Sequence, residues 1–201
     1  MRAVLLLALL PGCDRLFGLV HVDEVALDAG GDARTDADTP GDAPGDAVTP
    51  THSDCPLGFD LPYENSRYRA YGIGFTWHNA QAFCMSLKDP RSTKHVHLAV
   101  LTDDLERSHV YTNVAGSAGA LWIGLSDTRV EGAFQWVSTQ QVSYPPASGG
   151  PWGASEPSTG PADDCVVVRA STTDFDAMLC STPNIYVCEC DDFATAPTHF
   201  E

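Results

Sequence analysis

Hydrophobic residues gather in short runs after residue 55, and polar turns separate the runs. Residues 121–125, Leu-Trp-Ile-Gly-Leu, predict a buried strand in which Gly124 marks a point where another backbone comes close. Alternating apolar positions in residues 132–137 predict a second strand after a polar turn at residues 127–131. We therefore expect two paired strands at the centre of the folded part.

Two segments have the spacing of amphipathic helices. In residues 76–87, Thr76 is a candidate N-cap, and one apolar stripe is formed by Trp77, Ala80, Cys84 and Leu87. Residues 103–115 begin with an Asp-x-x-Glu box at Asp103 and Glu106, and the positions expected to face a core are Leu105, Val110 and Val114. Further strands are predicted at residues 68–73, 97–101, 165–169 and 185–190.

Residues 1–12 have the character of a secretory signal peptide, because Arg2 precedes an apolar segment that is too short to span a bilayer. The sequence Leu10-Pro11-Gly12-Cys13 resembles the lipobox of bacterial lipoproteins, in which the cysteine is diacylated. This resemblance implies lipidation at Cys13, membrane attachment and a place on the bacterial cell envelope. The alternative is a plain signal peptide beside an unrelated cysteine, which predicts secretion.

Residues 13–54 are predicted to be a disordered acidic tether, since Asp, Ala, Gly, Thr and Pro dominate them and cannot form a core. Residues 21–54 contain nine acidic residues and one arginine, half of the formal net charge of −16. This charge argues against nucleic acid as a partner, because a phosphate backbone requires clustered Lys and Arg. The folded domain is expected at residues 55–190, followed by a tail at residues 191–201.

Short motifs follow one another in order along the predicted domain. They are Cys55-Pro56-Leu57-Gly58-Phe59, Thr76-Trp77-x-x-Ala80-x-x-x-Cys84, His97-Leu98-Ala99-x-Leu101, Trp122-Ile123-Gly124-Leu125, Gly132-x-Phe134-x-Trp136-Val137, Asp164-Cys165-Val166 and Tyr186-Val187-Cys188-Glu189. Each is weak alone, but the series resembles the C-type lectin-like domain family. The resemblance implies an α+β fold in which two helices flank small antiparallel sheets beside a long loop region, stapled by disulfides.

Six cysteines lie between residues 55 and 190, and the sequence alone leaves their pairing open. The family resemblance implies three disulfides: Cys84–Cys188, Cys165–Cys180 and Cys55–Cys190. Such bridges belong to an oxidising compartment outside the cytoplasm. A metal site at Cys188-x-Cys190 would instead need a reducing compartment or further ligands nearby.

The resemblance places ligand binding in the long loop between the second central strand and Cys165. Lectins of the family hold calcium there with a Glu-Pro-Asn or Gln-Pro-Asp motif, and sugar hydroxyls complete the calcium shell. Here Glu156 stands at the first position, and the hydroxyl of Ser158 replaces the amide. The other calcium ligands implied are Asp163 and Asp176, with Asp174 in reserve. These side chains offer oxygen atoms, which calcium prefers, whereas zinc would favour His or Cys.

A second calcium site implied by the resemblance combines the turn after the first central strand with acids of the loop: Asp127, Glu131, Asp163 and Asp164. Ordinary polar turn residues are the alternative for the first two. Trp152 is a candidate sugar contact or a core residue. His95-x-His97 places both rings on one face of a strand, but without a third ligand in reach we interpret it as a half-exposed strand.

The sequence lacks the motifs of hydrolases, zinc proteases and phosphate-binding loops, so a binding protein is expected rather than an enzyme. The leading hypothesis is a lectin-like module on the cell envelope that binds glycans, with calcium as cofactor. The alternative is a calcium-independent module on the same fold that binds a surface protein. It is favoured by Ser158 and by Asp176, which lies one residue further from Cys180 than the family pattern places its aspartate, where this chain has Ala177.

Overall fold

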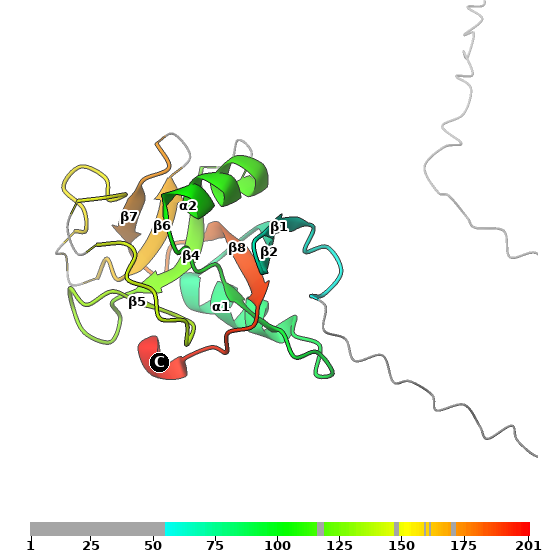
Figure 1. Ribbon diagram of the computed structural model, residues 1–201. Coiled ribbons are helices and arrows are strands. Elements are labelled where there is room, and N and C mark those ends of the chain that lie inside the picture. Colours follow the sequence, from blue (N-terminus) through cyan, green and yellow to red (C-terminus); the bar gives the residue numbers. More distant parts are fainter. Residues whose placement is uncertain (1–54, 116–118, 147–148, 159, 161, 170–171) are drawn as a thin grey trace, which may run out of the picture. The chain divides into compact units, whose positions relative to one another are not determined.

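The computed structural model describes residues 55–115, 119–146, 149–158, 160, 162–169 and 172–201 (Figure 1). These residues belong to one compact unit, Ala47–Glu201. The expected signal peptide, the lipidation site at Cys13 and the tether lie outside the described residues. Within the described part, no helix is long and apolar enough to cross a membrane.

One mixed sheet of eight strands organises the domain. The strands are β1 (Leu61–Tyr63), β2 (Ser66–Phe75), β3 (His95–Leu98), β4 (Ala120–Ser126), β5 (Gln135–Trp136), β6 (Cys165–Arg169), β7 (Phe175–Met178) and β8 (Asn184–Asp191). Their order is β1-β2-β8-β4-β6-β7, with β3 paired to β8 and β5 to β4. The α+β class is confirmed, and the antiparallel pairs expected from the sequence merge into one sheet because β4 and β8 pair in parallel.

The sequence pattern locates most of these strands. The predicted segment at 165–169 coincides with β6, while the segments at 121–125, 68–73 and 185–190 lie inside β4, β2 and β8. The segment expected at 97–101 leaves the ladder after Leu98, although the Ala99 N–H still donates to the Val187 carbonyl oxygen at 2.9 Å. The pattern does not predict β1 and β7, because strands of three and four residues are too short to show an alternation.

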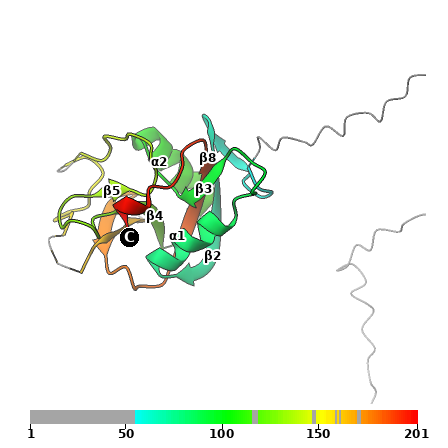
Figure 2. The ribbon, with the colours of Figure 1, turned by 90° about the horizontal axis from the view of Figure 1, so that it is seen from below.

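The first predicted helix is α1 (Trp77–Ser86), and the Thr76 hydroxyl caps it by accepting from the Asn79 N–H. Its buried residues include Trp77, Ala80 and Cys84, as the apolar stripe predicts. The helix packs along β3 and β8, whereas α2 (Asp104–Val110) lies apart from it near β1 (Figures 1 and 2). A π-helical turn, η1 (Tyr111–Ala115), continues α2.

The core-facing side of α2 differs from the prediction. Asp103 caps the helix, because its carboxylate accepts from the N–H groups of Leu105 and Glu106. Leu105, however, is 74% exposed, so its expected core position is wrong. The inward positions are Glu106 and Val110, one turn apart, because the Glu106 carboxylate accepts hydrogen bonds from the buried Tyr68 and from the half-buried Thr102.

Gly124 in β4 is the point of close backbone approach that the sequence predicts. Its N–H donates to the Ala99 carbonyl oxygen, and its carbonyl oxygen accepts from the Val137 N–H, each at 2.8 Å. A Cβ atom at this position would lie 2.6 Å from the Val137 side chain and 2.7 Å from the Leu98 carbonyl oxygen. No side chain fits there without moving a backbone.

Residues 191–201 form part of the domain rather than a separate tail. Asp191 ends β8, and the N–H of Ala196 donates to the Val137 carbonyl oxygen at 2.7 Å. A short 3-10 helix, η2 (Pro197–His199), follows, and Phe200 is buried against Trp77. The C-terminal residues therefore pack against Val137, where the long loop begins.

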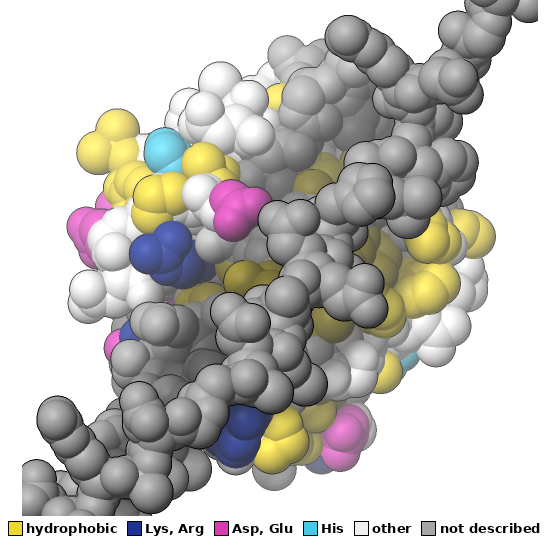
Figure 3. Space-filling model, turned by 90° about the vertical axis from the view of Figure 1, so that its right-hand side faces the viewer, with side chains coloured by type: hydrophobic (Ala, Val, Ile, Leu, Met, Phe, Trp, Pro, Cys, Tyr) yellow, Lys and Arg dark blue, Asp and Glu magenta, His cyan; other side chains and the backbone are white. Residues whose placement is uncertain are grey.

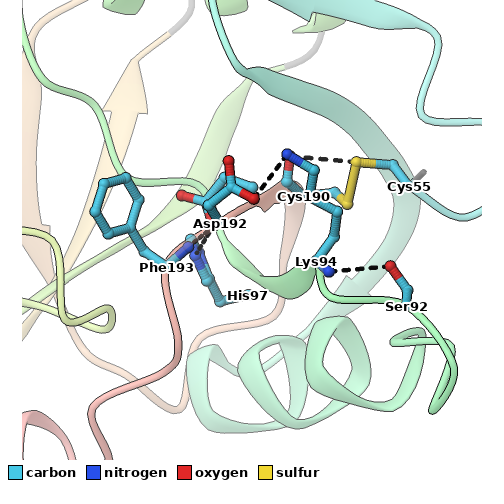
Figure 4. Close-up of a disulfide and its surroundings, with 8 residues drawn as sticks. Cys55, Ser92, Lys94, His97, Cys190, Asp192 and Phe193 are labelled. Carbon is cyan, nitrogen blue, oxygen red and sulfur yellow. Dashed lines mark hydrogen bonds and ion pairs between the residues drawn. A yellow bond between two sulfur atoms is a disulfide. The ribbon is translucent and has the colours of Figure 1, made fainter. Parts of the chain in front are cut away.

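Three disulfides join the same cysteines that the family resemblance implies: Cys55–Cys190, Cys84–Cys188 and Cys165–Cys180. Two of them attach the start of the domain and α1 to β8, and the third ties β6 to the segment after β7. Figure 4 shows the Cys55–Cys190 bridge beside Lys94 and Asp192, which form an ion pair at 2.9 Å.

We predict that Gly124→Ala lowers the free energy of unfolding by about 1–3 kcal/mol or more, because the added methyl overlaps backbone atoms as well as a side chain. Urea denaturation measures the change. The matched control is Gly72→Ala, since a Cβ atom at Gly72 meets nothing within 4 Å. Equal stability of the two variants would contradict the close approach at Gly124.

Candidate functional site

The long loop returns to the sheet at Glu156, whose carboxylate is held by backbone groups. One oxygen, Oε2, accepts from the Ser158 N–H at 2.7 Å and from the Ala177 N–H of β7 at 3.1 Å. The preceding Ser155 has a positive φ of 68°, and the Glu156–Pro157 peptide bond is cis. The first predicted calcium ligand is thus tied to β7 and points along the loop toward Ser158.

Ser158 and Asp163 meet across the same loop, where the Ser158 hydroxyl donates to Asp163 Oδ2 at 3.1 Å. Asp176 lies on β7, is 7% exposed and forms an ion pair with the guanidinium of Arg169 on β6. Glu156, Ser158 and Asp163 are therefore linked by hydrogen bonds, and Asp176 lies beside the Glu156 carboxylate. Asp174, the reserve ligand, is half-buried at the edge of β7, where its carbonyl oxygen accepts from the Arg169 N–H.

The electrostatics of the cluster disfavour two neighbouring carboxylates without a cation. Burial raises the pKa of Glu156, and the nearby Asp176 raises this pKa further, while the N–H groups of Ala177 and Ser158 act in the opposite direction. Arg169 supplies positive charge on the Asp176 side. Sequence reasoning missed Arg169, although its place at the end of the predicted 165–169 strand, beside the acidic 174–176 segment, was a signal.

The turn after β4 gathers a second group of acids. Asp127 is buried, its Oδ2 accepts from the Gly132 N–H at 2.7 Å, and its own N–H donates to the Asp164 carbonyl oxygen at 3.0 Å. Burial raises the pKa of Asp127, and the charges of Glu131 and Asp164 add to the rise. Asp127 Oδ1 is buried without a hydrogen-bond partner among the described residues. Asp163 is also predicted to belong to this second site, but its carboxylate accepts a hydrogen bond from Ser158.

These donor sets fit calcium in chemistry, because they consist of carboxylate and hydroxyl oxygens and include one buried oxygen without a partner. Among the described residues, however, no three His, Cys, Asp or Glu side chains stand together as a metal-ligating group. The Arg169 ion pair and the Ser158 hydrogen bond hold Asp176 and Asp163 in their present contacts.

Trp152 is mainly a core residue. It is 9% exposed, its ring lies 5.0 Å from that of Phe134 and 5.7 Å from that of Phe175, and its indole N–H donates to the Pro146 carbonyl oxygen. Trp122 and Trp136 are also buried. On the face in Figure 3, the visible Lys and Arg side chains are scattered among acidic and apolar ones and form no basic patch.

The interpretation of residues 95–97 as a half-exposed strand is wrong for His97, which is fully buried. Its ring nitrogens contact the Leu98 carbonyl oxygen at 2.8 Å and Asp191 Oδ1 at 3.2 Å. His95 is half-buried beside Lys88. The buried imidazole is accommodated because Asp191 offers a carboxylate partner, which the local sequence could not reveal.

A buried acidic network surrounds His97. Glu189 on β8 accepts from the Val100 N–H at 2.7 Å and from the Tyr68 hydroxyl at 3.2 Å, and the same hydroxyl contacts Glu106. Burial raises the pKa of Glu189 to about 8. Burial lowers the pKa of His97, but the hydrogen bond to Asp191 and the charge of Glu189 outweigh it, so this pKa is raised.

The fold and the loop together define a disulfide-stapled α+β binding domain. Residues 74–190 match the Lectin C-type domain family, and the chain therefore belongs to the C-type lectin domain family. This family consists of non-enzymatic binding domains and is often calcium-dependent. The three disulfides of this chain are typical of an extracellular protein.

Similar proteins include lectins from animals. Mouse C-type lectin domain family 4 member F is 30% identical over 118 residues, which are 56% of this chain, and the match spans only 19% of that protein. The alpha-N-acetylgalactosamine-specific lectin of Patiria pectinifera is 27% identical over 134 residues, 63% of this chain and 75% of that protein.

Two solved structures share the fold. The C-type lectin CEL-I from Cucumaria echinata has a TM-score of 0.60 and 24% identity, covering 68% of this chain and 96% of its own. A calcium-independent type II antifreeze protein has a TM-score of 0.57 and 25% identity, covering 68% of this chain and 93% of its own.

We predict that the domain loses stability as the pH rises from about 5 to about 8. Glu189 and His97 both have raised pKa values in the folded state, so the folded domain retains protons that the unfolded chain releases in this window. The stabilisation is present at the acidic end and is lost as the pH approaches the folded-state values.

Melting temperatures across this range measure the effect. Glu189→Gln, which keeps the shape without the ionisable group, should flatten the profile, and the exposed Glu64→Gln should leave it unchanged. A profile that rises from pH 5 to pH 8 in the unsubstituted protein would contradict the direction.

Proposed function

We propose that the domain binds glycans through a calcium ion held in the long loop. The observation that carries the proposal is the neighbourhood of Glu156, Ser158, Asp163 and Asp176, in which half-buried Glu156 lies beside buried Asp176 and is connected through Ser158 to half-buried Asp163. Glu156 and Asp176 would supply charge, and the Ser158–Asp163 pair further oxygens. Asp174 is the reserve ligand. A bound calcium ion would coordinate sugar hydroxyls directly.

The turn acids would form an accessory calcium site in the same proposal. Asp127 has one buried oxygen without a partner among the described residues, and Glu131 and Asp164 are close enough to raise its pKa. A cation between these groups would compensate the repulsion that burial strengthens. It would also fix the turn against the long loop, where Asp163 adjoins Asp164.

The family context supports sugars as the ligand class. The relative from Patiria pectinifera is named for N-acetylgalactosamine, and CEL-I is a C-type lectin. Ser158 differs from the amide that the family motif places there, and its hydroxyl lacks the amide's pair of N–H donors. The particular sugar preferred by this chain is therefore expected to differ from that of family members that retain the motif.

Calcium should raise the melting temperature of the oxidised chain, because a ligand at a hundredfold excess over its Kd stabilises by about 2.7 kcal/mol. Titration with calcium and reversal with a chelator measure the shift. Glu156→Gln preserves an oxygen acceptor for the two N–H groups and should abolish most of the response. The exposed Glu64→Gln is the matched control. Glycan array binding that disappears with chelator completes the test.

A second candidate is a calcium-independent module that binds a surface protein. The specific observation in its favour is the Arg169–Asp176 ion pair, which places a protein cation where the first proposal needs a metal ion. The hydrogen bond between Ser158 and Asp163 occupies a further predicted ligand. A protein of the same fold is described as calcium-independent, so the fold is compatible with this function.

Arg169→Gln separates the two candidates. If the loop binds calcium, freeing Asp176 from its ion pair should strengthen the calcium-dependent stabilisation, with Kd falling by about two- to tenfold. Arg67→Gln, an exposed substitution on β2, is the control. A melting temperature that ignores calcium in both the unsubstituted protein and the Arg169→Gln variant would overturn the calcium proposal and favour the calcium-independent module.

We further propose that a diacylated Cys13 displays the domain on a bacterial cell envelope, with residues 14–54 as a spacer. The support is the lipobox-like sequence and the acidic, Pro- and Gly-containing composition of the segment that follows. Mass spectrometry of the mature chain tests this. A diacylglyceryl adduct that is lost in Cys13→Ser is expected, and an unmodified chain recovered from the medium would favour secretion.

A further inference from the structure

A hollow of about 390 Å³ lies beside β5, on the side of the domain where the chain ends. It is bounded by the turn before β5, the loop that follows it, Trp152 and His199 of η2. Figures 1 and 2 both show β5 next to the C-terminal helix. None of the proposed calcium ligands lines it, so the hollow is separate from the loop cluster.

The walls of the hollow are held by hydrogen bonds. The indole N–H of Trp136 donates to the Tyr144 carbonyl oxygen at 2.6 Å, and the Tyr144 hydroxyl donates to Asp104 of α2 at 2.7 Å. The indole N–H of Trp152 donates to Pro146, and the His199 ring contacts the Trp136 carbonyl oxygen. These bonds fix the wall residues in place, which makes the hollow a preformed site.

The chemistry of the lining selects a neutral ligand with both apolar and polar faces. Among the described residues that line the hollow, none is Asp, Glu, Lys or Arg, although the chain carries a formal net charge of −16. Aromatic side chains from Phe134, Trp136, Tyr144 and Trp152 line it together with the amides of Gln140 and Gln141. A charged ligand would lose its hydration without gaining a counter-charge.

One polar atom of the lining lacks a partner. Gln140 Oε1 is buried and accepts no hydrogen bond from the described residues. A buried acceptor in this condition costs free energy. Because Gln140 belongs to the lining, a change of its side-chain rotamer would turn Oε1 into the hollow, where a hydroxyl donor from a ligand would recover that free energy. The volume corresponds to roughly a dozen water-sized groups, the scale of one hexose ring.

We infer that this hollow is a second, calcium-independent subsite for one neutral pyranose unit, and the choice of sugar as ligand class rests on the proposed function. The C–H face of the ring lies against the aromatic wall, and a hydroxyl donates to Gln140 Oε1. A glycan chain that reaches both places is held by calcium in the loop and by an uncharged pocket beside β5.

The test uses the full oxidised chain in chelator, with methyl glycosides of galactose, glucose and mannose as probes, followed by saturation-transfer NMR. Ala133→Trp fills the mouth of the hollow from an exposed position, and Leu57→Trp, which adds the same side chain at a 96% exposed site, is the matched control. We expect binding of at least one glycoside, lost in the first variant and kept in the second.

Gln140→Leu provides an independent variant, because it removes an acceptor that has no partner within the described part of the protein. We expect glycoside binding in chelator to weaken by about two- to tenfold, while the melting temperature stays level or rises. A purely structural role would lower the melting temperature and leave binding unchanged, which would overturn the inference.

The outcomes separate the two sites. Binding in chelator that survives Glu156→Gln but not Ala133→Trp supports the subsite, whatever happens in calcium. Absence of binding in chelator for all probes, or binding indifferent to both Ala133→Trp and Gln140→Leu, overturns it. Calcium-dependent glycan binding that Glu156→Gln abolishes would leave the proposed loop function standing in that case.

Discussion

The architecture depends on the contact at Gly124, where three backbone segments meet without an intervening side chain. The strand β4 is hydrogen-bonded there to Ala99 on one side and to Val137 on the other. The Val137 carbonyl oxygen in turn accepts from the Ala196 N–H. Val137 therefore holds both the start of the long loop and the C-terminal residues. Because the loop starts from this fixed point, its return to β7 can bring Glu156 to a defined place.

The second constraint is β8, which lies against β2, β3 and β4. Cys188 and Cys190 attach it covalently to α1 and to the start of the domain, and Glu189 between them is buried. Alternation along a strand sends the two cysteines and the glutamate to opposite faces of the sheet. Disulfides therefore stabilise one face while a polar network with His97 and Tyr68 occupies the other.

Arg169 on β6 balances the charge of Asp176 on β7. In the proposed function, a calcium ion would compete with Arg169 for the same carboxylate. The hollow beside β5 differs from the acidic loop, because its aromatic rings and amides would hold a neutral sugar ring without an ion. The two proposals together would give the domain one acidic and one neutral ligand site, with Trp152 lying in the loop and lining the hollow.

The sequence by itself determined the extent of α1, the position of β6 and the need for glycine at residue 124, because these depend on local periodicity, capping and side-chain size. Its resemblance to a known family implied the α+β class. It also indicated the acids of the loop, since the motifs that carry the family resemblance are contiguous. It placed Leu105 in the core wrongly, because which side of α2 faces inward depends on Tyr68, a partner nearly forty residues away.

Only the tertiary structure decided the partners of the charged groups. The pairing of Arg169 with Asp176 and the burial of His97 each arise from contacts between segments that are separate in the chain. The chain end was likewise expected to be a tail, yet its last aromatic ring is buried. Hydrophobic pattern and spacing report which segments fold, whereas the free energy of a charge depends on the neighbours that folding brings to it.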